Sequence, residues 1–499
     1  MPIEPVYEKF SATEKIGDVV TQVKIECKTD VPSDSVEKIV SENAASVVTL
    51  GEVKEGRAEI VDKTTFFICY RTAEGIKKCE CGAEIRDALT SDVIEEGDGV
   101  KLFWETDKTE IDLTGLKMGV SAYLTVKGEI FRKKEYSALK GGEGLNCKFS
   151  EKETAKSYGV CTGAYQAEEE FELTFNVAEV LSHRAEVCVT AVQCGVGTII
   201  CDGEIYLTEI LLQSGEKNDI IRENRVIPFR AEVECEDAMP QFSATCRAFV
   251  KSLKTDVTVD GEKNVSTVTA QVSVGLCGEA YSFAETSFVM DVFCSDCELK
   301  LSPEKAVFSA ESEPSSSFIK LVGKAAVDSP AGAKIAAVMG EKAEVASVLK
   351  TGDKVTVTGV MTFNVVFSGE ETGVISRKAE IPFETNADYS GEGKIKAYIT
   401  PKSANARLIS ATETECEAEA VITLYSEREY VAEFISAVEE GEKKPEEAAA
   451  VSVYIPLAGE GLWELAKRLN VSPETLMATN GDLQFPLTGK ERIAVYRQK

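Results

Sequence analysis

Three stretches of alternating apolar and polar residues constrain the fold of this chain more than any other feature. A period of two places successive side chains on opposite faces of a β-strand, so that one face is buried and the other is wet. The apolar positions are Leu116, Met118, Val120, Ala122, Leu124 and Val126; Val268, Ala270, Val272, Val274 and Leu276; and Cys416, Ala418, Ala420, Ile422 and Leu424. This alternation predicts a mainly β chain of tandem antiparallel modules, each a sandwich or a barrel with little helix.

Each alternating stretch follows a shorter repeated segment. The segments begin at Val36, Val177 and Ile335, and each carries apolar residues at its first, fourth and fifth positions. This spacing predicts a short helix or helical turn that leads into a strand. The separations between the segments are domain-sized, so we expect three tandem β modules. The predicted modules span residues 15–145, 150–300 and 305–435.

A further landmark, Ile-Pro-Phe, recurs in the second and third repeats and places Pro228 and Pro382 inside β-rich runs. Proline has no backbone N–H to donate to a neighbouring strand. We therefore expect each of these prolines at the start of a strand or on the edge of a sheet.

The charge balance excludes some partners. The chain holds 84 acidic and 55 basic residues, for a net charge of −29. Such a chain repels phosphate backbones and anionic membrane surfaces, so we expect no nucleic-acid partner. No apolar run approaches the ~20 residues that cross a bilayer, and the start MPIEPVYEKF lacks the features of a signal peptide. We therefore expect a cytosolic protein without membrane insertion.

The cysteines and the single histidine bear on metal and catalytic chemistry. Without a signal peptide, the fifteen cysteines are expected to be reduced thiols packed as small apolar residues. Cys294 and Cys297 form one CxxC and Cys79 and Cys81 one CxC, but zinc needs a second pair or histidines at suitable spacing. We expect no metal site and no cofactor. The only histidine is His183, placed in one of the predicted helical turns.

A catalytic site is not expected either. One histidine leaves almost no room for a Ser-His-Asp or Cys-His arrangement, and no Walker-type or dinucleotide-binding glycine motif is present. Carboxylates are numerous, so a glycosidase-like pair stays open by count alone. Most of them alternate with apolar residues along strands, as Glu415, Glu417 and Glu419 do, which is typical of a solvated face. The sequence predicts a non-enzymatic protein.

Composition changes after the third module. Residues 436–450 read SAVEEGEKKPEEAAA, which is charged and rich in alanine and has no apolar stripe. We interpret residues 436–451 as an acidic linker; a flexible coil of about 15 residues separates its ends by roughly 20–25 Å. A helical extension of the last module is the alternative.

The remaining residues, 452–499, predict a small domain of order strand, helix, helix, strand. Leu462, Leu465 and Leu469 share one helical face. Ser472 is a good N-cap for a second helix, which we expect to end near Asn480. Six basic residues against five acidic ones between 453 and 499 make this segment electrostatically distinct from the acidic body.

Residues 459–466, 470–476 and 480–483 closely resemble the LysM domain. LysM domains bind N-acetylglucosamine polymers, above all peptidoglycan, in a groove between the first strand–helix loop and the second helix–strand loop. The resemblance implies a binding site at Gly459, Glu460, Gly461, Leu462, Asn480, Gly481, Asp482 and Leu483. The first loop reads Gly-Glu-Gly-Leu where the family usually has Gly-Asp-Ser/Thr-Leu, so the usual hydroxyl is missing.

The three β repeats resemble, less specifically, the SPOCS domains of spore-forming Firmicutes. SPOCS modules followed by an acidic linker and a LysM domain are the layout of a spore-coat morphogenesis family. The resemblance implies a spore-coat assembly adaptor in the mother-cell cytoplasm, at the forespore surface. Its LysM domain would dock on a coat morphogenetic protein, the basement-layer ATPase. The alternative is a cell-wall protein that binds peptidoglycan glycan.

Overall fold

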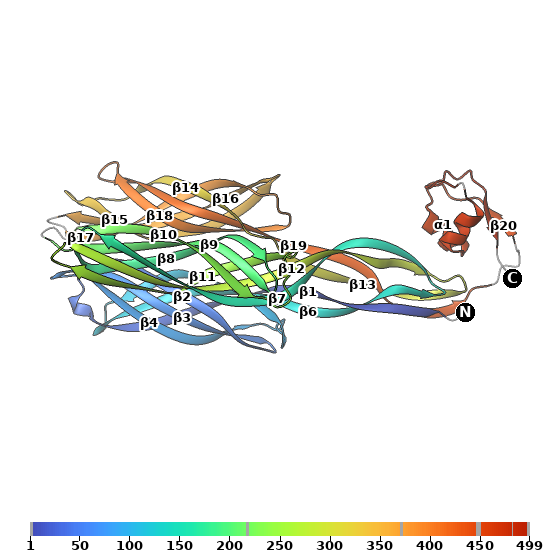
Figure 1. Ribbon diagram of the computed structural model, residues 1–499, viewed down its shortest axis with the longest axis horizontal. Coiled ribbons are helices and arrows are strands. Elements are labelled where there is room, and N and C mark those ends of the chain that lie inside the picture. Colours follow the sequence, from blue (N-terminus) through green and yellow to red (C-terminus); the bar gives the residue numbers. More distant parts are fainter. Residues whose placement is uncertain (1–2, 216–218, 370–372, 446–450, 482, 497–499) are drawn as a thin grey trace.

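The computed structural model describes residues 3–215, 219–369, 373–445, 451–481 and 483–496. It has three parts (Figure 1): a broad head of β-sheets, a narrow stalk of paired strands, and a small domain with helices beside the far end of the stalk. The prediction of a mainly β, antiparallel fold is confirmed. No helix in the described ranges is both long and apolar enough to cross a bilayer.

The head consists of three modules, and each is built from two facing antiparallel sheets. In the first, β1 (Glu4–Pro32), β6 (Lys117–Glu143) and β5 (Gly99–Asp112) face β2 (Lys38–Lys54), β3 (Arg57–Thr72) and β4 (Gly75–Thr90). In the second, β7 (Asn146–Leu173), β12 (Val265–Phe293) and β11 (Ser243–Asp260) face β8 (Val177–Cys194), β9 (Thr198–Gln213) and β10 (Ile220–Glu234). A short 3-10 turn, Ser33–Ser35, joins the two sheets of the first module.

The third module repeats this plan with one strand divided. Its first sheet contains β14 (Ser315–Ala326), β19 (Glu413–Lys443) and β18 (Lys394–Leu408), with β13 (Cys297–Glu311) continuing along β19 beyond β14. Its second sheet contains β15 (Lys334–Thr351), β16 (Lys354–Gly369) and β17 (Gly373–Asp388). An apolar core lies between the two sheets of each module.

The alternating stretches are the central strands β6, β12 and β19, and their predicted apolar faces are buried. Val120, Val272 and Ile422 are each 0–2% exposed. Leu116 is the exception, because it precedes the first residue of β6 and is 95% exposed. Pro228 and Pro382 lie in β10 and β17, which are edge strands of their sheets, as predicted.

The predicted helical turns are wrong: the three repeated segments belong to strands β2, β8 and β15. Each of these strands carries irregularities in register near the repeated apolar residues, between Val180 and Ser182 in β8 for example. A β-bulge inserts an extra residue and so interrupts the two-residue alternation. Apolar residues three and four positions apart can then both be buried, which imitates the spacing of a helix.

The stalk is formed by the outer ends of the longest strands. Three two-stranded antiparallel ribbons pair residues 4–15 with 131–143, 146–157 with 281–293, and 297–311 with 427–443. Aromatic residues from all three pack inside it; the ring centroid of Phe10 lies 5.4 Å from that of Phe288 and 5.2 Å from that of Phe434. At ~3.3 Å per residue, the 31 residues of β19 span ~100 Å.

This stalk corrects the predicted linker. Residues 436–443 continue β19, paired with β13, rather than forming a flexible coil. Ile435 and Val438 are buried in the stalk, so the chain has an apolar stripe that the many charges obscured. Residues 446–450 lie outside the described residues.

The terminal segment folds as β20 (Val451–Tyr454), α1 (Leu462–Leu469), α2 (Pro473–Thr479) and β21 (Ile493–Tyr496). Leu465, Leu476 and Ile493 form its core. The Ser472 hydroxyl accepts a hydrogen bond from the Thr475 amide at 3.1 Å, which caps α2 at its N-terminus.

Candidate partner-binding site and the junctions that position it

The terminal domain is docked on the tip of the stalk through helix α1. Trp463 Nε1 donates a hydrogen bond to Asp291 Oδ2 at 2.8 Å, and Lys467 Nζ contacts both carboxylate oxygens of Asp291 at 2.7 and 2.8 Å. The Trp463 ring packs edge-on against Phe293, with ring centroids 5.2 Å apart. Burial raises the pKa of Asp291, but hydrogen bonds from Lys467 and Trp463 outweigh it and lower the net pKa. Trp463 therefore belongs to an intramolecular interface.

A second set of contacts joins the domain to the turn between β12 and β13. Asn470 Nδ2 donates a hydrogen bond to the carbonyl of Ser295. Lys444 Nζ donates to the carbonyl of Cys294 at 2.8 Å and to Asn470 Oδ1 at 2.7 Å. Asn470 ends α1 in the left-handed conformation, with φ of 58°, so its side chain is placed by the end of the helix.

The first predicted binding loop is held by contacts within the domain. Gly459 has φ of 86°, a conformation that favours glycine, and its amide donates to the Leu487 carbonyl at 2.7 Å. Both oxygens of the Glu460 carboxylate accept hydrogen bonds from Arg468 at 2.8 Å. Its side chain is only 6% exposed, and the Arg468 hydrogen bond lowers its pKa. Glu460 is thus a structural residue of this loop.

The second predicted loop is also partly structural. Asn480 Nδ2 donates to the carbonyls of Leu476 and Ala494 at 3.0 and 2.7 Å, while its Oδ1 accepts from the Ala494 amide at 2.8 Å. Asn480 therefore ties the end of α2 to β21. Leu462 and Leu483 both pack against the domain core.

Two glycines remain candidates for contact with a ligand. A Cβ added to Gly459 or Gly481 would meet nothing within 4 Å. Gly461 is the N-cap residue of α1, where an added Cβ would crowd the Glu464 side chain. Asp482 lies outside the described residues. Among their described residues, the loops therefore offer open backbone at two positions rather than a set of free polar side chains.

An exposed apolar row that was not predicted from the sequence runs along β20 and toward the first loop. Val453, Ile455 and Leu457 alternate along and beyond β20 and are 64%, 70% and 66% exposed. Val451 and Tyr496, which pair across the two-stranded sheet, extend the row. An exposed contiguous apolar surface on a small domain is typical of a protein-binding site. The alternation in residues 451–457 was the signal in the sequence.

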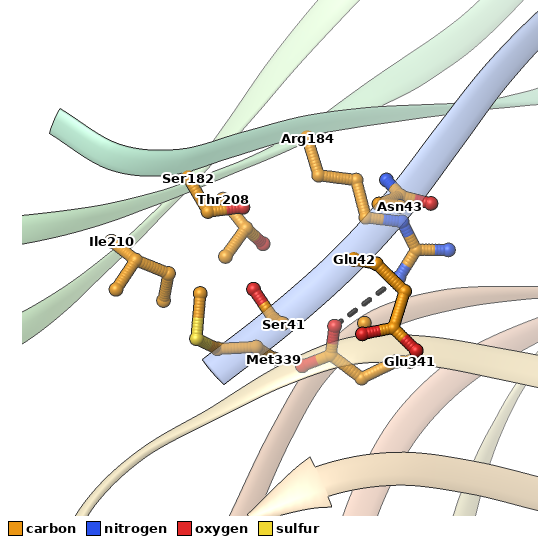
Figure 2. Close-up of a pocket in the computed structure, with 10 residues that line it drawn as sticks. Ser41, Glu42, Asn43, Ser182, Arg184, Thr208, Ile210, Met339 and Glu341 are labelled. Carbon is orange, nitrogen blue, oxygen red and sulfur yellow. Dashed lines mark hydrogen bonds and ion pairs between the residues drawn. The ribbon is translucent and has the colours of Figure 1, made fainter. Parts of the chain in front are cut away.

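The head modules are joined where their repeated segments meet. Val40, Leu181 and Met339, the fifth residues of the three segments, belong to one buried apolar cluster. Figure 2 shows the adjacent cavity, where Arg184 contacts Glu341 at 3.2 Å. The cavity measures about 10 Å³, which is room for one water molecule rather than for a substrate.

A buried network of charges joins the modules where the head meets the stalk. Lys396 of the third module contacts Glu129 of the first at 2.9 Å and Glu311 at 3.2 Å. Lys101 of the first module contacts Glu279 of the second at 2.5 Å. Burial raises the pKa of Glu129, but Lys396, Lys127 and Lys15 outweigh this effect and lower it to about 2. The network fixes the three modules to one another.

The single histidine lies in strand β8, at the contact between the first two modules. His183 Nδ1 lies 3.0 Å from the Thr255 hydroxyl, which donates to Glu209 Oε1 at 2.7 Å. Among the described residues, His183 Nε2 and Glu209 Oε2 have no hydrogen-bond partner. Burial lowers the pKa of His183 to about 4 and raises that of Glu209 to about 8. Near pH 6 the His183 imidazole is therefore unprotonated and the Glu209 carboxyl is protonated, so both side chains are neutral.

Comparison with known proteins finds no relative of this chain. No family model, no curated protein and no solved structure matches the chain. Within the described ranges, no group of three or more His, Cys, Asp or Glu side chains could hold a metal ion. A functional assignment therefore depends on the sequence resemblance and on the geometry of the terminal domain.

Proposed function

We propose that this protein is a non-enzymatic adaptor for assembly of a spore coat or spore envelope. In this proposal the terminal domain is a LysM-type domain that docks on a coat morphogenetic protein, the basement-layer ATPase, at the forespore surface in the mother cell. The three SPOCS-like modules bridge to other coat components. The arrangement supports a bridging role, because the stalk separates the terminal domain from the broad surface of the head.

The exposed apolar row of the terminal domain carries the proposal. Val453, Ile455 and Leu457 offer an apolar strip to a partner. A protein partner can bury such a strip, whereas a hydrated glycan gains little from it. Glu460 is already engaged by Arg468, so its carboxylate is not free to bind a sugar hydroxyl at the first loop.

The test is the position of a fluorescent fusion in sporulating cells of the source organism. The full-length protein is expected to form a ring around the forespore, and removal of residues 452–499 is expected to abolish the ring. The variant Ile455→Asp places a charge in the apolar row and is expected to have the same effect. Glu474→Ala changes an exposed residue of α2 and serves as the matched control. A truncated protein that still surrounds the forespore would contradict the docking role.

Peptidoglycan binding is the second candidate, favoured by the open backbone at Gly459 and Gly481. Backbone without a Cβ allows close approach of an N-acetyl group. Co-pelleting of the full-length protein with purified peptidoglycan separates the two functions. Glycan binding predicts that Gly481→Trp removes co-pelleting while Ile455→Asp leaves it intact. If the protein does not co-pellet with peptidoglycan at any tested concentration, peptidoglycan binding is excluded and the adaptor function remains.

A further inference from the structure

Two cysteines flank the turn on which the terminal domain is docked. Cys294 and Cys297 enclose Ser295 and Asp296, between the last residue of β12 and the first residue of β13. The Asp296 amide donates a hydrogen bond to Cys294 Sγ at 3.3 Å, so the sulfur points back across the turn. Both thiols are buried, and the pKa of Cys297 is raised to about 11 by burial first and by a hydrogen bond with the Cys294 thiol second. The two buried cysteines are separated by only two residues of one turn.

The same turn carries the second set of polar contacts that hold the terminal domain, in addition to those of Asp291. The carbonyls of Cys294 and Ser295 accept hydrogen bonds from Lys444 and Asn470. The preceding residue, Phe293, packs into the core of the terminal domain. The backbone between the two cysteines is therefore part of the docking interface, and its rigidity bears directly on how firmly the domain is held.

We propose that Cys294 and Cys297 form an oxidation site, whose disulfide locks the terminal domain onto the stalk. The oxidant is hydrogen peroxide. Its O–O bond breaks, an S–S bond forms between the two cysteines, and the two thiol protons leave in two molecules of water. The thiols lose two electrons in total and the peroxide gains them. The disulfide fixes the turn, so the carbonyls of Cys294 and Ser295 stay where Lys444 and Asn470 bind them.

The burial of the two cysteines and the pKa of the Cys297 thiol determine how fast the pair is oxidised. Cys294 and Cys297 are 2% and 1% exposed, and the thiolate is the reactive form of a thiol. A pKa of about 11 for Cys297 leaves little thiolate at neutral pH. Reaction is therefore slow at neutral pH, and it accelerates as the pH rises toward 11. The lock requires only the docked arrangement and is independent of what the terminal domain binds.

The experiment uses the full-length protein before and after treatment with hydrogen peroxide. Mass spectrometry of alkylated peptides identifies the disulfide, and hydrogen–deuterium exchange reports on the amides of residues 462–470. Oxidation is expected to join Cys294 to Cys297 and to slow exchange in α1 about tenfold, and dithiothreitol is expected to reverse both changes.

Two double variants complete the test. The variant Cys294→Ser with Cys297→Ser is expected to show the exchange of the reduced protein whether or not peroxide is added. The control, Cys161→Ser with Cys235→Ser, removes two thiols that pack in the core of the second module and is expected to retain the response. Oxidation of other thiols without a bond between Cys294 and Cys297 overturns the proposed site. A disulfide there that leaves exchange in α1 unchanged overturns the lock, and because wild-type protein gives both results, misfolding of a variant cannot obscure them.

Discussion

Replacing Glu209 with glutamine removes a buried acid that has one oxygen without a partner. Its Oε1 accepts a hydrogen bond from Thr255 at 2.7 Å, and its Oε2 has no partner among the described residues. The side chain is 0% exposed. Glutamine keeps the shape of the side chain and the acceptor for Thr255, but it cannot ionise.

The sign and size of the effect follow from the pKa. Burial, the largest effect, raises the pKa of Glu209 from 4.5 to about 8. The folded protein therefore holds this proton more tightly than the unfolded chain does, and the stability it contributes below pH 4.5 is lost as the pH rises toward 8. At pH 7 the loss is about 3 kcal/mol. A buried amide without a full set of partners costs about 1 kcal/mol, so Glu209→Gln is expected to gain about 2 kcal/mol at pH 7.

Thermal unfolding measured across pH tests this reasoning. A gain of about 2 kcal/mol corresponds to a rise in Tm of roughly 4–8 °C at pH 7 for a unit of this module's size. At pH 4.5 the variant is expected to unfold at the same temperature as the wild type or slightly lower. Glu232→Gln, on the exposed face of β10, is the matched control and is expected to be neutral at both pH values. A Tm for Glu209→Gln that is lowered equally at pH 4.5 and pH 7 would refute the argument.

Other substitutions test the junctions. Glu129→Gln is expected to lower the Tm at pH 7, because it removes one of the carboxylate partners of the buried Lys396. Since the pKa of Glu129 falls from 4.5 to about 2 on folding, this loss of about 3 kcal/mol is expected to vanish as the pH falls through that range; a deficit independent of pH would contradict it. Asp291→Ala removes the acceptor for Trp463 and is expected to speed amide exchange in α1 without changing the Tm of the head, as calorimetry can check. Leu181→Ala is expected to destabilise the head by about 2–5 kcal/mol, measured by denaturant unfolding; a neutral result would show that the joint between modules tolerates a void.

The sequence could predict the strands whose two faces differ. In β12, Val272 and Val274 are buried while Gln271 is exposed, as the alternation of apolar and polar residues in the sequence predicts. The bulged strands could not be predicted in this way. In β8, Val180 and Leu181 are both buried because the register shifts beside them, and the resulting spacing looks helical.

The contacts between modules could not be predicted from local sequence patterns. Glu279 and Glu311 look like members of a solvated face, yet each is 5% exposed because cations from other strands surround it. The stalk was missed for a related reason, since the charges of residues 436–443 concealed their pairing with β13. In the terminal domain, Asn480 had the residue type of a ligand-binding position but is used to close the fold.

The continuous course of β19 from the head to the stalk tip has a mechanical consequence. A pull on the terminal domain reaches β19 at its C-terminal end and acts along the length of the strand. The hydrogen bonds between β19 and β13 run perpendicular to that direction, so they share the load in shear instead of breaking one after another. In a single-molecule pulling measurement, force applied between residue 496 and the head is expected to detach the terminal domain before it extends the stalk. The stalk is thus a stiff tether, and its first point of yield is the docking contact at its tip.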